Sequence, residues 1–177
     1  MNFEGKKVLI AYFSHVGETF SNGDTVELEK GNTETVVKHL AKKFNADTFK
    51  IETKQIYPVD YKACSEIAKQ ELESNIRPEL VKNCSIEGYD VIILGFPCWW
   101  RTVPMAVLTF IESHDFTGKT ILPFSTHEWS GKANSETDIR KAAPTANLLE
   151  GFTIHGTWIN TSEDKALAFV DKWFDEN

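Results

Sequence analysis

The stretch that decides the fold is YDVIILGFPCWWRTVP, residues 89–104. Its first half is a continuous apolar run, whereas a strand with one solvent-facing side would alternate apolar and polar residues. Continuous runs of this length are typical of parallel strands that helices cover on both faces. Three more segments of strand length occur, and we expect strands at 6–13, 47–53, 89–96 and 119–126.

Segments of helical length lie between and after these strands. Each places its apolar residues on one stripe, and we expect helices at 33–44, 60–73, 103–114 and 163–174. Strand followed by helix, several times over, predicts right-handed crossovers and an α/β fold with a doubly wound parallel sheet. A fifth strand is expected within 147–159, where Gly151 and Gly156 leave its limits open.

The segment 18–30 breaks this alternation. Asn22-Gly23 stands there between two short β-prone arms, which is the sequence signature of a tight hairpin. No internal repeat or low-complexity tract occurs in the sequence. We therefore expect one domain over residues 1–177, with a hairpin inserted at 18–30.

The composition restricts the ligands and partners of the chain. Its 177 residues include 19 Lys and Arg against 26 Asp and Glu, which gives a formal net charge of −7 at pH 7. Nucleic acid and anionic membranes would repel such a protein at long range, so we expect neither as a partner. Any anionic ligand must be held by neutral donors.

The cysteines and the hydropathy suggest a cytoplasmic protein. Cys64, Cys84 and Cys98 lie far apart, form no CxxC motif and are odd in number, which suits a reducing compartment better than a disulfide framework. No apolar stretch approaches the ~20 residues of a membrane-spanning helix. The five histidines share no metal-ligand spacing, so we expect no metal site.

The first candidate site loop begins at Ser14-His15 and ends, after the hairpin, at Gly31-Asn32-Thr33. Ligands of open parallel sheets bind beyond the carboxyl ends of the strands, where this loop should lie. Hydroxyls, an amide and free N–H groups at a helix N-terminus form an anion site without Lys or Arg. A plain N-cap role for Asn32 or Thr33 fits this stretch about as well. Neither GxGxxG nor GxxxxGK[ST] occurs, which argues against dinucleotide and P-loop sites.

Two further loops follow the other apolar strands. Trp99 and Trp100 are adjacent just beyond a strand end and cannot both point into one core, so at least one should face the crevice. Packing of one Trp in the core remains the default. The loop from Phe124 to Gly131 adds hydroxyls, an imidazole and another Trp, which suit hydrogen bonding to the edge of a heterocycle.

These motifs, taken in order, resemble the flavodoxin family. The order is LIAYFS, then GNTxxV opening a helix, then YDVIxLGxPxWWxxxPMxVxxFxE, then DFxGKTIxPFSTHxxSG. The resemblance extends from Val8 to the last helix. Within the family, the sequence resembles in particular the single-domain branch that carries a PxWW loop. It implies a three-layer, flavodoxin-like sandwich with a five-stranded parallel sheet of order 2-1-3-4-5, for which flavodoxin is itself the type example, and FMN as the cofactor.

The resemblance also implies which residues contact FMN. Those that would hold the phosphate are Ser14, Asn32 and Thr33. Those that would line one side of the isoalloxazine are Pro97, Cys98, Trp99 and Trp100. Those that would form the opposite loop are Ser125, Thr126 and His127, with the turn at Gly131. No catalytic residue is implied.

The chain departs from the family pattern in two places. Residues 15–30 are inserted between Ser14 and Gly31, and Gly17-Glu18-Thr19 looks like a second, weaker copy of the loop ending. We favour Asn32 and Thr33 as the phosphate residues because the helix starts after them, and the insert would form a flap over the cofactor mouth. Arg101 stands where relatives often have a small residue, and it would face either the ring or solvent.

Two functions remain open under this resemblance. An FMN protein of this size could carry electrons between redox partner proteins, docking through an acidic face. It could instead be an NAD(P)H-dependent FMN oxidoreductase acting on quinones or similar small acceptors. We favour the carrier because no nicotinamide site is recognisable in the sequence.

Other classes fit less well. A receiver-like signalling domain would need a carboxylate at the end of the first strand, where Tyr12-Phe13-Ser14 stands. A hydrolase would need a relay, but Ser125, His127 and Glu128 are too close in sequence to align as one, and no GxSxG elbow occurs. A flavin-free interaction module that kept only the fold is the remaining alternative.

Overall fold

A computed structural model describes residues 1–177 and contains a central parallel sheet. Its strands are β1 (Val8–Tyr12), β4 (Asp47–Lys50), β5 (Val91–Pro97), β6 (Thr120–His127), β7 (Asn147–Leu148) and β8 (Phe152–His155). The order across the sheet is β4-β1-β5-β6-β7, and β8 also pairs with β6. All of these pairings are parallel. When the strands of this sheet alone are numbered along the chain, β1, β4, β5 and β6 are the first to fourth strands, and β7 and β8 share the fifth position. The predicted order 2-1-3-4-5 is confirmed.

Pro123 explains why the fifth position is split. Ile121 in β6 accepts a hydrogen bond from the Leu149 amide, so Pro123, two residues further on, faces the same neighbour. Proline has no amide hydrogen to donate, and the neighbouring strand leaves the ladder there. Gly151, between the two short strands, lies close against Pro123. A Cβ at position 151 would lie 2.0 Å from the Pro123 carbonyl oxygen, so only glycine fits there.

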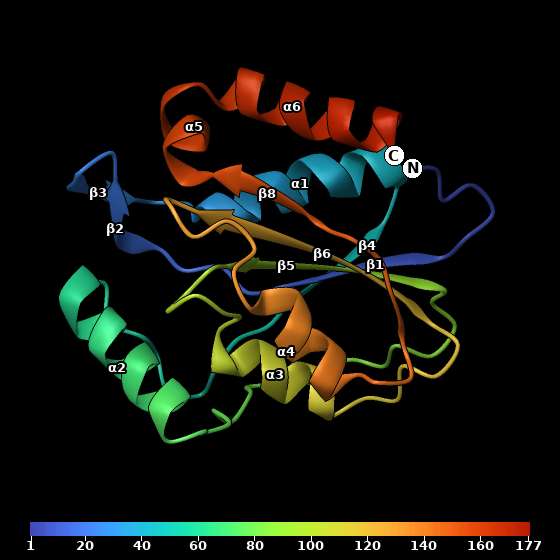
Figure 1. The fold of residues 1–177 in the computed structure, drawn as a ribbon, viewed down its shortest axis with the longest axis horizontal. Helices are drawn as coiled ribbons and strands as arrows, with labels where there is room; N and C mark the ends of the chain where they lie inside the picture. Colours follow the sequence, from blue (N-terminus) through green and yellow to red (C-terminus); the bar gives the residue numbers. More distant parts are fainter.

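Helices cover both faces of the sheet (Figure 1). On one face lie α1 (Asn32–Phe44), α5 (Gly156–Thr161) and α6 (Glu163–Glu176). On the other lie α3 (Met105–Glu112) and α4 (Ser135–Ala142), with α2 (Tyr61–Glu73) displaced toward the carboxyl edge of the strands. Each face has its own buried apolar cluster. No helix in the structure is both long enough and apolar enough to cross a membrane.

The predicted hairpin forms at the carboxyl edge of the sheet. Strands β2 (Gly17–Ser21) and β3 (Asp24–Leu28) pair antiparallel, and Asn22 and Gly23 both have positive φ angles, of 51° and 94°. Two positive φ angles are what a two-residue turn between twisted strands requires. The Glu18 amide donates to the Val59 carbonyl at 2.8 Å, which ties the hairpin to the segment before α2.

The sequence did not predict α4 or α5. Helix α4 buries only Ser135 and Ile139, so its sequence lacks the apolar stripe that identifies the other helices. Helix α5 begins at Gly156, inside the segment 147–159, where we expected a strand with open limits but no helix. The expected helix at 103–114 begins at Met105, directly after Pro104, and the other predicted helices lie close to their expected bounds.

Candidate functional site

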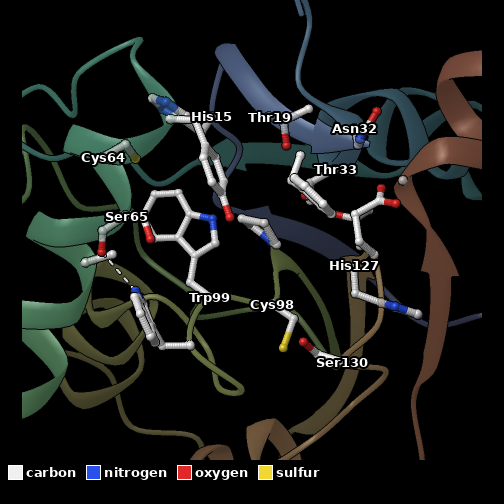
Figure 2. A pocket seen from close by; sticks show the side chains of 18 of the residues that line it. His15, Thr19, Asn32, Thr33, Cys64, Ser65, Cys98, Trp99, His127 and Ser130 are labelled. Carbon is white, nitrogen blue, oxygen red and sulfur yellow. Dashed lines mark hydrogen bonds between the residues drawn. The ribbon is translucent and has the colours of Figure 1, made fainter. Parts of the chain in front are cut away.

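A cavity of about 350 Å³ opens at the carboxyl edge of the sheet, between the hairpin, α2 and the loops that follow β1, β5 and β6 (Figure 2). The predicted site residues that line it are Ser14, Asn32, Thr33, Pro97, Cys98, Trp99, Trp100, Thr126 and His127. They come from three loops that are far apart in the sequence. The geometry thus joins the residues that the motifs suggested separately.

Ser125 and Gly131 are the two predicted residues that do not line this cavity. Successive side chains of a strand point to opposite sides, so Ser125 is turned away from the cavity that its neighbour Thr126 lines. The Ser125 side chain is buried, and its hydroxyl donates to the Gly131 carbonyl at 3.2 Å. Direct contact of these two residues with the cofactor stays a prediction. In the structure their hydrogen bond links the end of β6 to the turn at Gly131.

The N-terminus of α1 forms the polar end of the cavity, which we call the amide end: Ser14, Gly31, Asn32 and Thr33. Ser14 Oγ accepts a hydrogen bond from the Glu34 amide at 3.2 Å, while the N-cap residue Gly31 has no side chain to offer. The first amides of the helix, at Asn32 and Thr33, have no intrahelical partner. Ser14 therefore caps α1 from a distant loop, and the alternative that Asn32 or Thr33 is merely the N-cap is wrong.

Gly31 lets the two halves of the amide end meet. A Cβ at Gly31 would lie 2.3 Å from both the His15 carbonyl oxygen and Ser14 Oγ. Thr33 packs behind them, fully buried, with its hydroxyl 2.9 Å from that of Thr126. Ser14 and the start of α1 are therefore held in one arrangement by close packing and hydrogen bonds.

Glu128 adds a carboxylate to the same end of the cavity. Its oxygens accept hydrogen bonds from the Thr157 amide at 2.9 Å and the Thr157 hydroxyl at 2.7 Å. A Cβ at Gly156 would lie 2.6 Å from Glu128 Oε1 and 2.8 Å from Asn32 Nδ2, so both side chains lie close to Gly156. Sequence reasoning did not assign Glu128 to the site, because α5, whose first turn it contacts, was not predicted.

The loop after β5 forms a tight turn from Trp99 to Thr102. These two residues exchange backbone hydrogen bonds of 3.0 Å each. The central residues Trp100 and Arg101 have φ angles of 48° and 65°, a left-handed conformation that costs a non-glycine residue about 1–2 kcal/mol. Such strain persists only where the surroundings enforce it.

Neighbouring elements enforce this turn. The Trp100 indole donates to the Ser65 carbonyl of α2 at 2.8 Å. The Asn134 amide donates to the Arg101 carbonyl at 2.9 Å, and the Thr102 hydroxyl donates to Asp138 at 2.6 Å. The turn is therefore fixed by α2 on one side and by α4 and the residue before it on the other.

The two adjacent tryptophans divide their roles, although both line the cavity. Trp99 packs edge to face on Phe13 and Tyr57, with ring centroids 5.2 Å apart in each case. Trp100 is 46% exposed, and Lys69 Nζ lies 5.5 Å from its ring centroid. The prediction that at least one Trp faces the crevice is confirmed. We call Trp99, Trp100, Arg101 and Thr102 the tryptophan turn.

His15 lies beside Trp99 and was not predicted as a site residue. Its ring packs on Trp99 and Tyr57, and its Nε2 atom is buried without a hydrogen-bond partner. Burial lowers the pKa of the His15 imidazole, although a hydrogen bond at the Pro58 backbone opposes this. A single histidine after a strand carries no recognisable signal in a sequence. Only its position beside Tyr57 and Trp99 identifies it.

Burial favours the neutral forms of two further polar groups of the cavity, Cys98 and His127. Burial raises the pKa of the Cys98 thiol, and hydrogen bonds with Ser130 and Ser135 counteract this only in part. Burial and the neighbouring His155 lower the pKa of His127. No cluster of three or more potential metal ligands occurs in the structure. The charged residues of the cavity wall are Glu18, Arg101 and Glu128.

The hairpin forms one wall of the cavity. Thr19, Phe20 and Leu28 face it, opposite Tyr61 and Ser65 of α2. Phe20 and Tyr61 contact each other, with ring centroids 6.3 Å apart. The Tyr61 amide donates to the Glu18 carboxylate at 3.1 Å, so the wall is closed at this point.

Comparisons with known proteins agree with this geometry. A family model described as flavodoxin matches residues 7–176. No curated protein matches the sequence. A candidate flavoprotein from Bacteroides eggerthii has a TM-score of 0.72 and 29% identity, over 94% of this chain and 97% of its own. A candidate flavoprotein from Bacteroides uniformis has a TM-score of 0.70 and 28% identity, over 95% of this chain and 99% of its own.

A flavoprotein from Lactobacillus acidophilus, solved in complex with FMN, shares the fold. Its TM-score is 0.65 and its identity 19%, over 96% of this chain and 99% of its own.

Proposed function

The chain belongs to the flavodoxin family, and we propose that its cavity binds FMN and that the protein carries electrons between redox partners. One observation carries this proposal. The amide end and the tryptophan turn are the two ends of a single cavity at the carboxyl edge of the sheet. An anion site joined to an aromatic wall is what a phosphorylated, flat, aromatic cofactor requires.

The amide end suits the phosphate of FMN. The Asn32 and Thr33 amides have no intrahelical partner, and the N-terminal end of the α1 dipole favours an anion. The hydroxyls of Ser14 and Thr33 and the Asn32 side chain add neutral donors around them. A domain with a net charge of −7 would repel a phosphate at long range, so oriented neutral donors must supply the binding free energy.

The tryptophan turn and the β6 loop suit the isoalloxazine. Pro97, Cys98, Trp99 and Trp100 would form one wall, and Thr126 and His127 would approach from the other side. When bound, FMN supplies the electron-transfer or hydride-transfer chemistry, and the protein orients and tunes it. Trp99 and its aromatic neighbours would exclude water from the ring, while Arg101 would place a positive charge near it.

The mouth of the cavity supports transfer to a partner protein. Trp100 and Trp129, which both line the cavity, are 46% and 75% exposed. Aromatic side chains that are rigid and partly exposed are common anchors in protein interfaces. The net charge of −7 would steer a partner with a complementary basic face.

A second candidate function has one observation in its favour. The hairpin and α2 wall off part of the cavity through the contact between Phe20 and Tyr61. Such a wall would shape a pocket for a small acceptor and hinder a large partner. It favours an NAD(P)H-dependent FMN oxidoreductase acting on quinones or similar molecules.

Two measurements on the FMN-loaded protein test these proposals. Quenching of FMN fluorescence on titration into the apoprotein would report binding, and a protein that stays colourless would contradict the flavin proposal. Anaerobic mixing with NADPH then separates the two functions. We expect slow reduction unless a reductase partner is added, whereas rapid reduction without one would establish the oxidoreductase.

A further inference from the structure

The structure places an unexpected negative charge where the cofactor phosphate would bind. Glu128 lines the cavity at the amide end, and its side chain is only 14% exposed. The carboxylate and the Asn32 side chain both lie close to Gly156, within 2.6 Å and 2.8 Å of the position that a Cβ there would occupy. Asn32 is one of the neutral donors that the proposed function assigns to the phosphate. An anionic group thus lies next to the site of a phosphate that is itself close to a dianion at neutral pH.

Glu128 cannot easily turn away from this position. Both of its oxygens accept hydrogen bonds from Thr157, one from the amide at 2.9 Å and one from the hydroxyl at 2.7 Å. No Lys or Arg forms an ion pair with it. Its nearest cationic candidate is His155, whose Nδ1 atom lies 3.4 Å from Oε2 but forms no hydrogen bond. The carboxylate is therefore fixed in place with its charge largely uncompensated.

We infer that Glu128 sets the selectivity of this cavity for the charge on its cofactor. Its carboxylate repels the phosphate of FMN but leaves the uncharged riboflavin part of the molecule unaffected. The protein therefore binds FMN more weakly, relative to riboflavin, than its neutral donors alone would allow. This inference rests on the proposed function, because it requires the phosphate to lie at the amide end.

Glu128→Gln tests the inference. Glutamine keeps the shape of the side chain and can still accept the hydrogen bond from the Thr157 amide. We expect this variant to bind FMN about tenfold more tightly or better, since one unit charge within a few ångströms of a phosphate is worth at least that much in a partly buried site. Riboflavin carries no phosphate, so its affinity should change by less than about twofold. Both dissociation constants are measured by fluorescence quenching at pH 8, where the phosphate is a dianion.

One matched variant separates the local charge of Glu128 from the net charge of the protein. Glu87→Gln makes the same chemical change in the exposed loop before β5, at the opposite edge of the sheet. It changes the net charge equally and should leave the ratio of FMN to riboflavin affinity unchanged.

The outcomes are distinguishable. Selective tightening of FMN in Glu128→Gln alone supports the inference. Equal changes for both ligands, no change, or the same tightening in Glu87→Gln overturns it while leaving FMN binding established. Failure of the wild-type protein to bind either flavin contradicts the proposed function itself, and the inference with it.

Discussion

The two ends of the cavity are built in opposite ways. The amide end uses hydrogen-bonding groups at a helix N-terminus, and Gly31 there has an ordinary extended conformation with φ −66° and ψ 146°. The tryptophan turn holds two non-glycine residues at positive φ and depends on α2, α4 and their surroundings to keep them there. Both ends depend on contacts with distant segments, but only the tryptophan turn also holds non-glycine residues in a strained backbone conformation. Substitutions should accordingly lower FMN affinity most at the amide end, whereas relief of backbone strain can raise stability only at the tryptophan turn.

The largest effect is expected at Gly31. In Gly31→Ala, the added Cβ would lie 2.3 Å from the His15 carbonyl oxygen and from Ser14 Oγ, so the loop must move away from α1. Several phosphate donors would lose alignment at once, and each is worth about 1.5–3 kcal/mol when it binds a charged group. We expect FMN affinity to fall by more than about 100-fold, with a loss of about 1–3 kcal/mol in the free energy of unfolding. A fluorescence titration in which affinity is unchanged would show that the phosphate does not bind at the amide end.

Ser14→Ala should have an intermediate effect on the same end. It removes the oxygen that accepts from the Glu34 amide, and loss of a capping side chain costs about 1 kcal/mol of stability. FMN affinity should fall by about tenfold, because a phosphate donor worth about 1.5 kcal/mol is lost, while riboflavin affinity stays the same. The control is Ser162→Ala, since Ser162 is the N-cap residue of α6 but makes no capping hydrogen bond. Equal destabilisation in both variants, measured by urea unfolding, would contradict the capping role of Ser14.

At the tryptophan turn, Arg101→Gly should raise stability rather than lower it. Glycine removes the left-handed strain of φ 65°, and we expect a gain of about 1 kcal/mol in the free energy of unfolding. Arg101→Ala removes the same charge but keeps the strain, so it should be no more stable than the wild type. If Arg101 faces the flavin, both variants should shift the midpoint potential to more negative values. A loss of stability in Arg101→Gly would show that the turn is not strained.

The smallest effect is expected beneath the tryptophan turn, at the pair Tyr57 and Glu71. The Tyr57 hydroxyl donates to the Glu71 carboxylate at 2.7 Å, and Tyr57 packs on Trp99. Burial raises the pKa of Glu71, and the hydrogen bond from Tyr57 opposes this only in part. A carboxyl group whose pKa is raised by folding stabilises the protein below its unfolded pKa, about 4.3 for glutamate, and this contribution is lost as the pH rises through the folded value.

Glu71→Gln should therefore match the wild type in acid and become slightly more stable than it toward neutral pH. Urea unfolding at a series of pH values measures this difference. Glu73→Gln, on the exposed side of the same helix, makes the same change of charge and should show no such trend. A pH-independent difference for Glu71→Gln would contradict the raised pKa of the Glu71 carboxyl.

The difference between the two ends also explains what the sequence could predict. The apolar strands, the four helices with an apolar stripe and the Asn22-Gly23 turn follow from periodicity and local turn preferences, and all appear in the structure. The amide end was predictable for the same reason: Gly31, Asn32 and Thr33 directly precede or begin a helix whose stripe is visible.

The parts that could not be predicted depend on contacts between distant segments. His15 is identified only by packing on Tyr57 and Trp99, and the left-handed turn is imposed by Ser65, Asn134 and Asp138. Glu128 reaches the amide end because β8 is followed by α5, which has too short and too polar a sequence to be recognised. Residues that act through tertiary contacts leave no periodic pattern.

The most direct test of the account is a crystal structure of the protein with FMN. We propose above all that one cavity holds the FMN phosphate at the amide end and the isoalloxazine ring at the tryptophan turn. We predict phosphate oxygens within about 2.7–3.2 Å of the Asn32 and Thr33 amide nitrogens, with the isoalloxazine between Trp99 and the loop at Thr126 and His127. A phosphate that points to the hairpin or to solvent, or a flavin bound outside this cavity, would contradict it.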